Sequence, residues 1–350
     1  MKKLLWLAFS GLIPICILFV ALYLFDPLQI FHKPYWRENF FVRDMRDQAY
    51  GIISNYEFDS IILGSSILQN TSSFETKQKL SGEWVNLSIS GGNLQERLAV
   101  IKEAVKKHKI KNVIFSISWH EVKRFPKQYS LNPFLYNGIR LDDFFVYANP
   151  KYFLCLFYQT LCLREGRKDL DRPARWGDKE DAQVLFGGFQ NWIGKNPKQA
   201  TKQLFENLTN LNNNQKDNKD CFPRELLHFI QENPQINFIL VIPPFSRLYY
   251  KLNSDTSKSI IKDILSLYLK NIKIYGFDNT NIPDNLSLYM DQFHYDEKVN
   301  SFMLDAIKND THRITLENVD SYFEEMRKRV EAYDIELLRK QIIESGVLAN

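Results

Sequence analysis

The sequence predicts an α/β fold in which a parallel sheet carries helices on both faces. Apolar runs suited to buried strands occupy residues 61–63, 84–89, 112–117, 236–242 and 272–277. The run at 61–63 is apolar without alternation, which is typical of a strand covered on both faces. Helical patterns separate the earlier runs, and strands that alternate with helices favour βαβ units and a parallel sheet.

The helices between these strands have recognisable starts. Ser72 and Glu75 have the Ser-x-x-Glu spacing of a capping box. Asn93 is a good cap for a second helix, whose apolar residues fall on one face as far as Val105. The strand at 236–242 must end at the Pro-Pro pair that follows it, because proline has no amide hydrogen for the ladder.

The chain starts with the pattern of a membrane anchor. Leu4 to Phe25 is a stretch of 22 uncharged residues, and about 20 apolar residues span the hydrocarbon core of a bilayer. Lys2 and Lys3 precede it and favour a cytoplasmic N-terminus. A cleaved signal peptide is the alternative, but the stretch does not end in an Ala-x-Ala site. We expect an uncleaved anchor at 1–26 in a bacterial inner membrane, with the rest of the chain in the periplasm or extracytoplasmic space.

Three further segments accompany the expected α/β domain at 55–310. Residues 27–54 are rich in aromatic and charged residues, which suit either the lipid headgroup region or packing on the domain. Residues 122–230, interrupted by prolines, are an expected insertion that forms a lid or side wall, and long insertions in α/β domains are often functional. The tail at 311–350 has apolar residues at alternating steps of four and three, which favours packing on the domain or a protein partner.

The composition argues against nucleic-acid binding and does not otherwise restrict the function. The net charge of +4 comes from 45 basic and 41 acidic residues, which form no obvious basic patch. Cys155 and Cys162 are too far apart to form a disulfide if they lie on one continuous helix. No Cys/His spacing resembles a zinc site, so we expect neither a metal nor a cofactor.

Ser66 is the best candidate for a nucleophile. It follows the strand at 61–63 after Gly64, whose backbone freedom would allow a sharp turn. Open α/β sheets bind ligands beyond the carboxyl ends of their strands, which is where this turn would lie. By itself, an apolar run that ends in Gly-Ser-Ser is more often an ordinary turn.

A candidate base and its orienting acid lie near the other end of the chain. Asp291 and His294 are three residues apart, so that one turn could aim both at the same serine. A serine hydroxyl needs a neighbouring base to take its proton, and that base needs a group to fix its tautomer. The isolated Asp-x-x-His pattern is common, and a solvated loop is the alternative.

Together these residues resemble the SGNH or GDSL hydrolases, in particular membrane-anchored SGNH-like proteins that modify bacterial envelope polysaccharides. Gly64-Ser65-Ser66 is similar to the family's first block, Gly-Asp-Ser, with a serine in place of the aspartate. Asn86 to Gly92 resembles the second block, and Asp291 with His294 matches the fifth. The resemblance implies a three-layer α/β/α fold with an SGNH or flavodoxin-like parallel sheet.

The resemblance also implies roles for single residues. Ser66 would be the nucleophile, and the amide of Gly91 would help to form an oxyanion hole. The family's third block usually holds an oxyanion-binding asparagine, which Val113 to Glu121 lacks. His120 takes its place, and we weigh donation to the oxyanion against a structural role at the sheet edge. Arg247 is a candidate ligand for an anionic or polyol substrate, with a solvated surface arginine as the alternative.

These features predict an extracytoplasmic serine-dependent acyl esterase or O-acyltransferase that acts on a cell-envelope polysaccharide or glycoconjugate through an acyl-serine intermediate. Its partners would be an acylated carbohydrate or other acyl donor, the inner membrane and an envelope-modification protein. The alternative is a non-catalytic SGNH-like scaffold or binding protein in an envelope assembly, which the missing asparagine favours. Hydrogen bonds joining Ser66, His294 and Asp291 would favour the enzyme.

Overall fold

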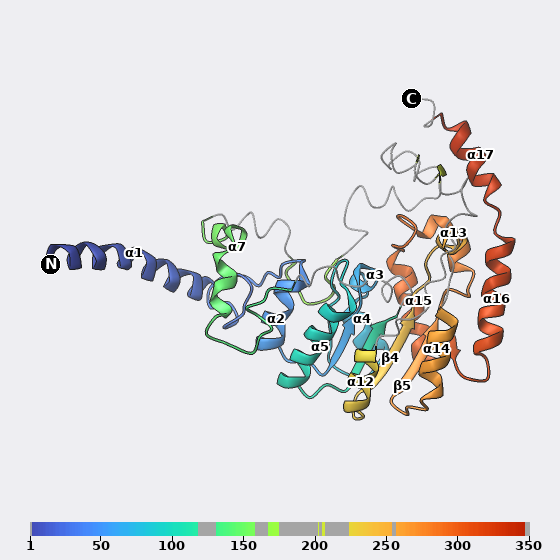
Figure 1. Cartoon of the computed structure of the whole chain (residues 1–350), viewed down its shortest axis with the longest axis horizontal. Coiled ribbons are helices and arrows are strands. Elements are labelled where there is room, and N and C mark those ends of the chain that lie inside the picture. Colours follow the sequence, from blue (N-terminus) through green and yellow to red (C-terminus); the bar gives the residue numbers. More distant parts are fainter. Residues whose placement is uncertain are drawn as a thin grey trace.

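A six-stranded sheet forms the centre of the molecule (Figure 1). The computed structural model describes residues 2–117, 131–157, 167–174, 202, 205–206, 224–253 and 257–346, with the backbone alone for residues 2–12 and 257. The strands are β1 Ser60–Leu63, β2 Trp84–Asn86, β3 Asn112–Ser116, β4 Asn237–Ile242, β5 Ile272–Gly276 and β6 Arg313–Ile314, in the order β2-β1-β3-β4-β5-β6. Five strands run parallel and β6 is antiparallel to β5. The predicted α/β class with a mostly parallel sheet is therefore confirmed.

Helices connect the strands and extend the chain at both ends. They are α1 Lys2–Phe25, α2 Met45–Asn55, α3 Ser66–Gln69, α4 Ser73–Lys79, α5 Leu94–Lys107, α7 Pro150–Leu154, α12 Arg224–Glu232, α13 Arg247–Leu252, α14 Ser257–Ser266, α15 Glu297–Lys308, α16 Val319–Ala332 and α17 Glu336–Glu344, with 3-10 turns at Asp143–Ala148, Ile282–Asp284 and Leu286–Leu288. Both predicted N-cap residues cap their helices, but the Glu75 side chain pairs with Lys79 in α4. Ser72 accepts from the Glu75 amide at the start of α4, and Asn93 and Glu96 form a complete capping box on α5.

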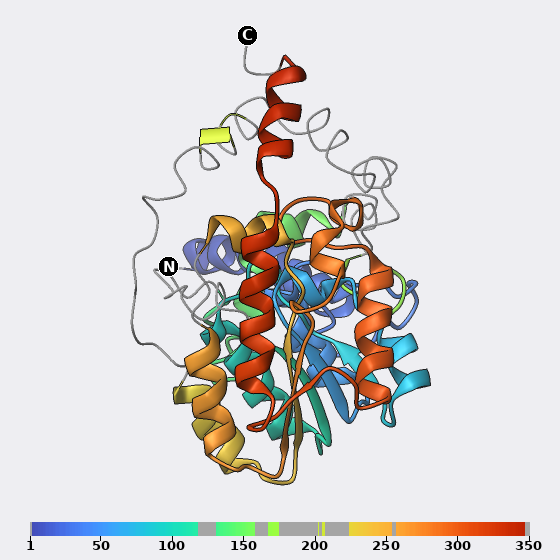
Figure 2. The ribbon, with the colours of Figure 1, turned by 90° about the vertical axis from the view of Figure 1, so that its right-hand side faces the viewer.

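Two hydrophobic clusters pack on opposite faces of the sheet. Ile61 and Leu63 of β1 belong to the cluster that includes α2, α5, α12 and α14. Ile62, which points to the other face, belongs to the cluster that includes α13 and α15. Figure 2 shows α16 in front of the sheet edge, between α14 and α15. Because α16 contributes buried residues to both clusters, it covers the β6 edge, as the predicted packing of the tail requires.

The heptad pattern of the tail does not form one continuous seam. The first helix of the tail ends at Ala332, and the second begins at Glu336. Phe323 and Met326 are buried against the domain, whereas Leu337 is 58% exposed. The described part of the tail is therefore the short strand β6 followed by two helices, α16 and α17, with a break between them.

A third cluster attaches α1 to the domain. Leu22 and Phe25 at the end of α1 are buried with Phe40, Tyr147 and other residues of the N-terminal half. Asp26 follows and accepts hydrogen bonds from the amides of residues 30–32. Phe40 and Phe41 are buried, so part of residues 27–54 packs on the domain as expected, whereas Tyr35 and Trp36 are exposed.

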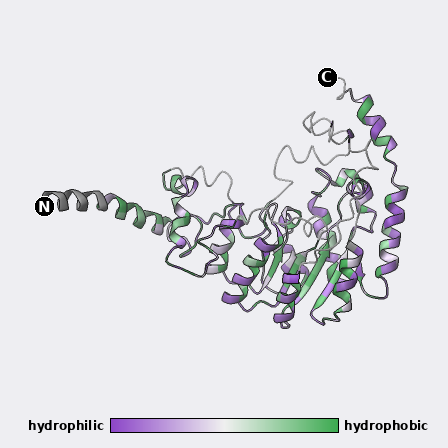
Figure 3. Ribbon diagram, viewed as in Figure 1, coloured by the Kyte–Doolittle hydropathy of each residue, from purple (hydrophilic) through white to green (hydrophobic). Residues whose placement is uncertain are grey.

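The N-terminal part of α1 extends away from the domain (Figure 1), and its placed residues are mostly hydrophobic (Figure 3). Several of its apolar side chains are exposed. They include Ile13, Ile15, Ile17, Phe19 and Val20. A search of the described part of the chain finds no helix with the length and hydropathy needed to cross a bilayer.

Cys155 does not lie within a continuous helix. Helix α7 ends at Leu154, and turns follow it. Cys155 is disulfide-bonded, with its partner outside the described residues. The condition under which Cys155 could not bridge to Cys162, one continuous helix, is therefore not met.

Candidate active site

Ser66 lies at the carboxyl end of β1 and is the first residue of α3. Every residue from Ser60 to Ser73 is buried except Ser66, which is partly exposed. The chain passes from β1 to β2 on one side and later returns to β3 on the other, so the strand order reverses beside β1. Open α/β sheets bind ligands at such a reversal, outside the carboxyl ends of the strands. The sheet therefore presents Ser66 where its geometry favours a binding site.

Gly64 is needed for space and not for an unusual backbone angle. Its φ is not among the positive values found at glycines of the described chain, so the expectation of a special backbone conformation is wrong. A Cβ added to Gly64 would come within 2.8 Å of Leu68 Cγ and of Ser116 Oγ. The absence of a side chain therefore lets α3 pack closely against β1 and β3.

Polar side chains at the end of β2 hold the turn that follows Ser66. Asn86 Nδ2 donates to the carbonyls of Leu68 and Thr71, at 2.7 and 2.8 Å. Ser88 Oγ accepts from the amide of Gly64 at 3.0 Å. Asn86 is fully buried, so these bonds form in an interior where leaving polar groups unpaired would be costly. The turn is therefore fixed from the neighbouring strand.

The loop that carries Asp291 and His294 is closed on itself and tied to α13. An isolated antiparallel bridge joins Tyr289 to Tyr295 across the loop. Ser246, the N-cap of α13, donates to the carbonyl of Gln292 through its amide at 3.1 Å and its hydroxyl at 3.0 Å. This short, closed loop brings the acid and the histidine to the Ser66 turn.

The three predicted catalytic residues form one hydrogen-bonded chain. Ser66 Oγ lies 2.8 Å from His294 Nε2, and His294 Nδ1 lies 2.6 Å from Asp291 Oδ2. When Nδ1–H donates to Asp291, Nε2 accepts from the serine hydroxyl, which is the arrangement of a base that can take the serine proton. The His294 side chain is 20% exposed, so a substrate can approach while most of the ring is held in place.

Asp291 is held in its ionised form. Burial acts to raise the pKa of its carboxyl, but the hydrogen bond and charge of His294 and the amides of His294 and Phe293 outweigh it, so the pKa is lowered. Both amides donate to Asp291 Oδ1 at 2.8 Å, which leaves Oδ2 to His294 Nδ1. An anion in this position stabilises the imidazolium that forms when His294 accepts a proton.

The expected oxyanion residues lie partly within the described chain. Gly91 is exposed, has φ of +58° and follows β2, the strand beside β1. The same loop is joined to the nucleophile turn by a 2.9 Å hydrogen bond from the Ile89 amide to the Gly64 carbonyl. His120 lies outside the described residues.

Arg247 does not lie at the site. Its side chain is buried, with 0% exposure, and its Nε lies 2.7 Å from Asp284 Oδ1. Its two terminal nitrogens donate to the carbonyls of Asp278 and Thr280. Arg247 is therefore neither a substrate ligand nor a solvated surface arginine. Its hydrogen bonds hold the loop after β5 in place.

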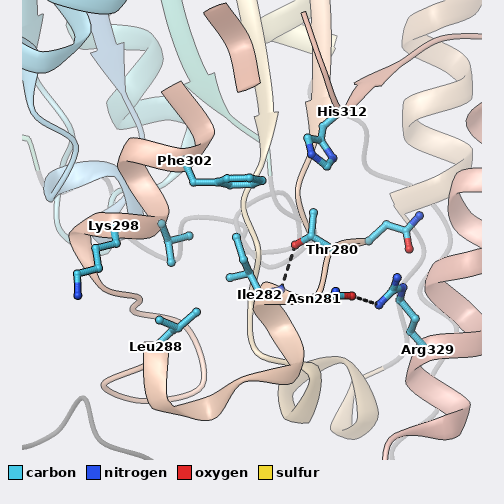
Figure 4. Close-up of a pocket in the computed structure, with 10 residues that line it drawn as sticks. Thr280, Asn281, Ile282, Leu288, Lys298, Phe302, His312 and Arg329 are labelled. Atoms are coloured by element: carbon cyan, nitrogen blue, oxygen red, sulfur yellow. Dashed lines mark hydrogen bonds between the residues drawn. The ribbon is translucent and has the colours of Figure 1, made fainter. Parts of the chain in front are cut away.

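A separate cavity of about 500 Å³ lies between the loop after β5, the start of α15 and α16, where Ile282, Lys298 and Arg329 are among its lining residues (Figure 4). Its wall is mainly apolar, and the triad residues are not among those that line it. In Figure 4, Arg329 reaches toward Asn281, to which it donates at 2.7 Å. The same guanidinium contacts Asp284 and Glu325, so its charge is already balanced by two carboxylates.

Within the residues that the structure describes, no group of three or more histidine, cysteine or acidic side chains is arranged to hold a metal ion. Comparison with protein-family models gives no match. Neither the curated proteins nor the solved structures contain a match to this chain.

Proposed function

We propose that the protein is a serine-dependent acyl esterase or O-acyltransferase. The observation that carries the proposal is the hydrogen-bonded chain of Ser66, His294 and Asp291 at the carboxyl end of β1. Ser66 is the one residue left partly exposed in an otherwise buried segment, which suits a nucleophile that must meet a substrate. The strand order β2-β1-β3-β4-β5 is that of flavodoxin-like sheets, which supports the fold that the resemblance to SGNH hydrolases implies.

The proposed reaction has two halves that share one acyl-serine intermediate. Ser66 Oγ attacks the acyl carbonyl carbon while His294 Nε2 takes the hydroxyl proton. The ester bond of the donor breaks, and the departing alcohol receives that proton from His294. Water or a sugar hydroxyl then gives a proton to His294 and attacks the acyl carbon, so that Ser66 Oγ leaves and regains its proton. Water as acceptor completes a hydrolysis, and a sugar hydroxyl completes a transfer.

The developing negative charge on the acyl oxygen needs preorganised donors. We assign this role to the amides of Ser66 and Gly91. The positive φ of Gly91 and its exposed position in the loop joined to the Ser66 turn support the assignment.

The proposed location is the outer side of a bacterial inner membrane, with an acylated envelope polysaccharide or glycoconjugate as substrate. The uncharged stretch from Leu4 to Phe25 and the exposed apolar side chains of α1 support an anchor, because such a surface is unfavourable in water. The disulfide at Cys155 supports an oxidising compartment. An envelope-modification protein remains the expected partner class.

The test is labelling of the full chain in detergent with a fluorophosphonate, which reacts with activated serines. We expect peptide mapping to find the adduct on Ser66, and we expect Ser66→Ala and His294→Ala to abolish it. Ser65→Ala is the matched control, because it removes the neighbouring hydroxyl and leaves the triad intact. A folded wild-type protein that stays unlabelled would contradict the proposal and favour the non-catalytic scaffold.

A further inference from the structure

Residues 167–174, here named the strap, lie against the turn that follows Ser66. Asp171 Oδ1 accepts from Ser72 Oγ at 2.5 Å and from the Phe74 amide at 3.1 Å. The Asp171 carbonyl also accepts from the Ser73 amide at 3.0 Å. The Asp171 side chain is 5% exposed, so its carboxylate is an interior partner for the first turn of α4.

Arg172 connects this turn to the histidine side of the triad. Its Nε donates to Asp171 Oδ2 at 2.9 Å, and its Nη1 contacts the Asn70 carbonyl at 3.3 Å and Glu297 Oε2 at 2.7 Å. Glu297 is the first residue of α15 and lies three residues after His294. The Arg172 side chain is 15% exposed and Glu297 is 58% exposed, so Arg172 is held in the interior while its partner on α15 faces solvent.

Asn70 reinforces the same connection. With its amide oriented to satisfy both neighbours, Asn70 donates to the Ala174 carbonyl at 3.3 Å and accepts from the Glu297 amide at 3.2 Å. The Ala174 amide in turn donates to the Gln69 carbonyl at 3.3 Å. The strap thus bonds to the serine turn on both sides of Asn70 and to the first residue of α15.

The other end of the strap is fixed to the N-terminal part of the domain. Phe41 and Arg167 exchange two backbone hydrogen bonds, at 2.8 and 3.0 Å. Phe41 is buried in the main core. The strap is therefore attached at one end to the core and at the other to both sides of the site.

We propose that Asp171 and Arg172 are positioning residues that set the distance between Ser66 and His294. The inference rests on the proposed function. Ser66 and His294 are 228 residues apart in the chain, so their 2.8 Å contact depends on how the serine turn docks on α15. A shift of about 1 Å in reacting groups can reduce a rate by about 100-fold. The strap connects the serine turn to α15 through a buried pair, Arg172–Asp171, and a partly exposed pair, Arg172–Glu297.

The test compares Arg172→Met with Lys168→Met in the full chain. Lys168 belongs to the same strap but forms an exposed pair with Glu38, in which the side chains are 77% and 74% exposed. For Arg172→Met we expect the limiting rate of fluorophosphonate labelling to fall about 10- to 100-fold, with little change in the half-saturating probe concentration. Lys168→Met should label at the wild-type rate. Glu297→Gln should slow labelling similarly, and the double variant should be no slower than Arg172→Met because both remove the same bridge.

Thermal unfolding and the ¹⁵N NMR signal of the His294 ring separate the outcomes. The inference predicts that Arg172→Met remains folded but shifts the His294 Nε2 signal, because the bond to Ser66 weakens. If Arg172→Met does not fold, the Glu297→Gln variant serves as the same test. Wild-type labelling with unchanged rate and ring signal in these variants would overturn the inference alone. A wild type that is not labelled would overturn the proposed function. The ¹⁵N signal of the His294 ring in the variants would then show whether the strap still positions Ser66 against His294.

Discussion

The Asp291 carboxylate sets the orientation and the tautomer of the His294 ring. It accepts two backbone amides on one oxygen and the His294 ring on the other, so the ring has one orientation and one tautomer suited to a base. The proposed reaction depends on this geometry, because Ser66 would lose its proton to His294.

We predict that Asp291→Asn lowers acyl-ester turnover by about 100- to 10,000-fold, because an amide stabilises neither the required tautomer nor the imidazolium. Initial-rate kinetics with an activated acetyl ester would measure the change. Asp296→Asn is the control, since Asp296 is the N-cap of α15 and an asparagine caps equally well. Equal losses in the two variants would mean that Asp291 acts only through folding.

Asp171 makes stability depend on pH. Burial acts to raise the pKa of its carboxyl, but bonds from Ser72, the Phe74 amide and Arg172 outweigh it and lower the pKa. Because the unfolded chain then binds the proton more tightly, the carboxylate stabilises the fold above its unfolded pKa, and this contribution is lost as pH falls through the folded pKa. We predict that Asp171→Asn flattens the acid side of the stability curve, measured by urea unfolding between about pH 3 and pH 6. If the slope of the unfolding free energy against pH is the same in the variant, the bonds of Asp171 do not stabilise its charged form.

Residues of the candidate site could be predicted where their spacing in the sequence is typical of a catalytic arrangement. Ser66, Asp291 and His294 come together as expected, since a serine after a strand and an Asp-x-x-His loop each restrict their own geometry. Arg247 was not predictable, because its partners Asp284 and the carbonyls at 278 and 280 are recognisable only once the loop folds around it. Asp171 gave no signal either, since its contacts are with residues about 100 positions away.

At the scale of elements, the junction of β1 and α3 is the most constrained part of the fold. We predict that Gly64→Ala destabilises the protein by about 1–3 kcal/mol, because a Cβ there would overpack against Leu68 and Ser116. Chemical unfolding would measure this change, and fluorophosphonate labelling would show whether Ser66 moves with it. A variant as stable as the wild type would contradict the account of Gly64.

The sequence predicted the elements that have periodicity or a cap and missed those that have neither. The capped helices α4 and α5 begin where expected, because side chains at fixed spacing define their first turns. Strand β6 has only two residues, too few for any pattern, and exists because Ile314 and Arg313 pair with β5. The break after α16 was missed because the heptad spacing continues across it.

At the scale of the whole molecule, the last turn of α1 packs on the domain. Leu22 and Phe25 are buried in the N-terminal cluster, and Asp26 accepts amides from residues 30–32. We predict that deleting residues 1–26 lowers stability relative to deleting residues 1–17, since each buried side chain contributes about 1.5–3 kcal/mol. Thermal unfolding of the two truncated proteins is the comparison. Equal melting temperatures would place these residues outside the cooperative unit.

The central claim is that Ser66 carries the acyl group, and trapping that intermediate tests it most directly. The full chain would be mixed briefly with an activated acetyl ester, quenched in acid and mapped by peptide mass spectrometry. We predict one acetyl group on Ser66 in the wild type and none in Ser66→Ala or His294→Ala. Acetylation at another residue, or none in a folded protein that binds the ester, would contradict the account.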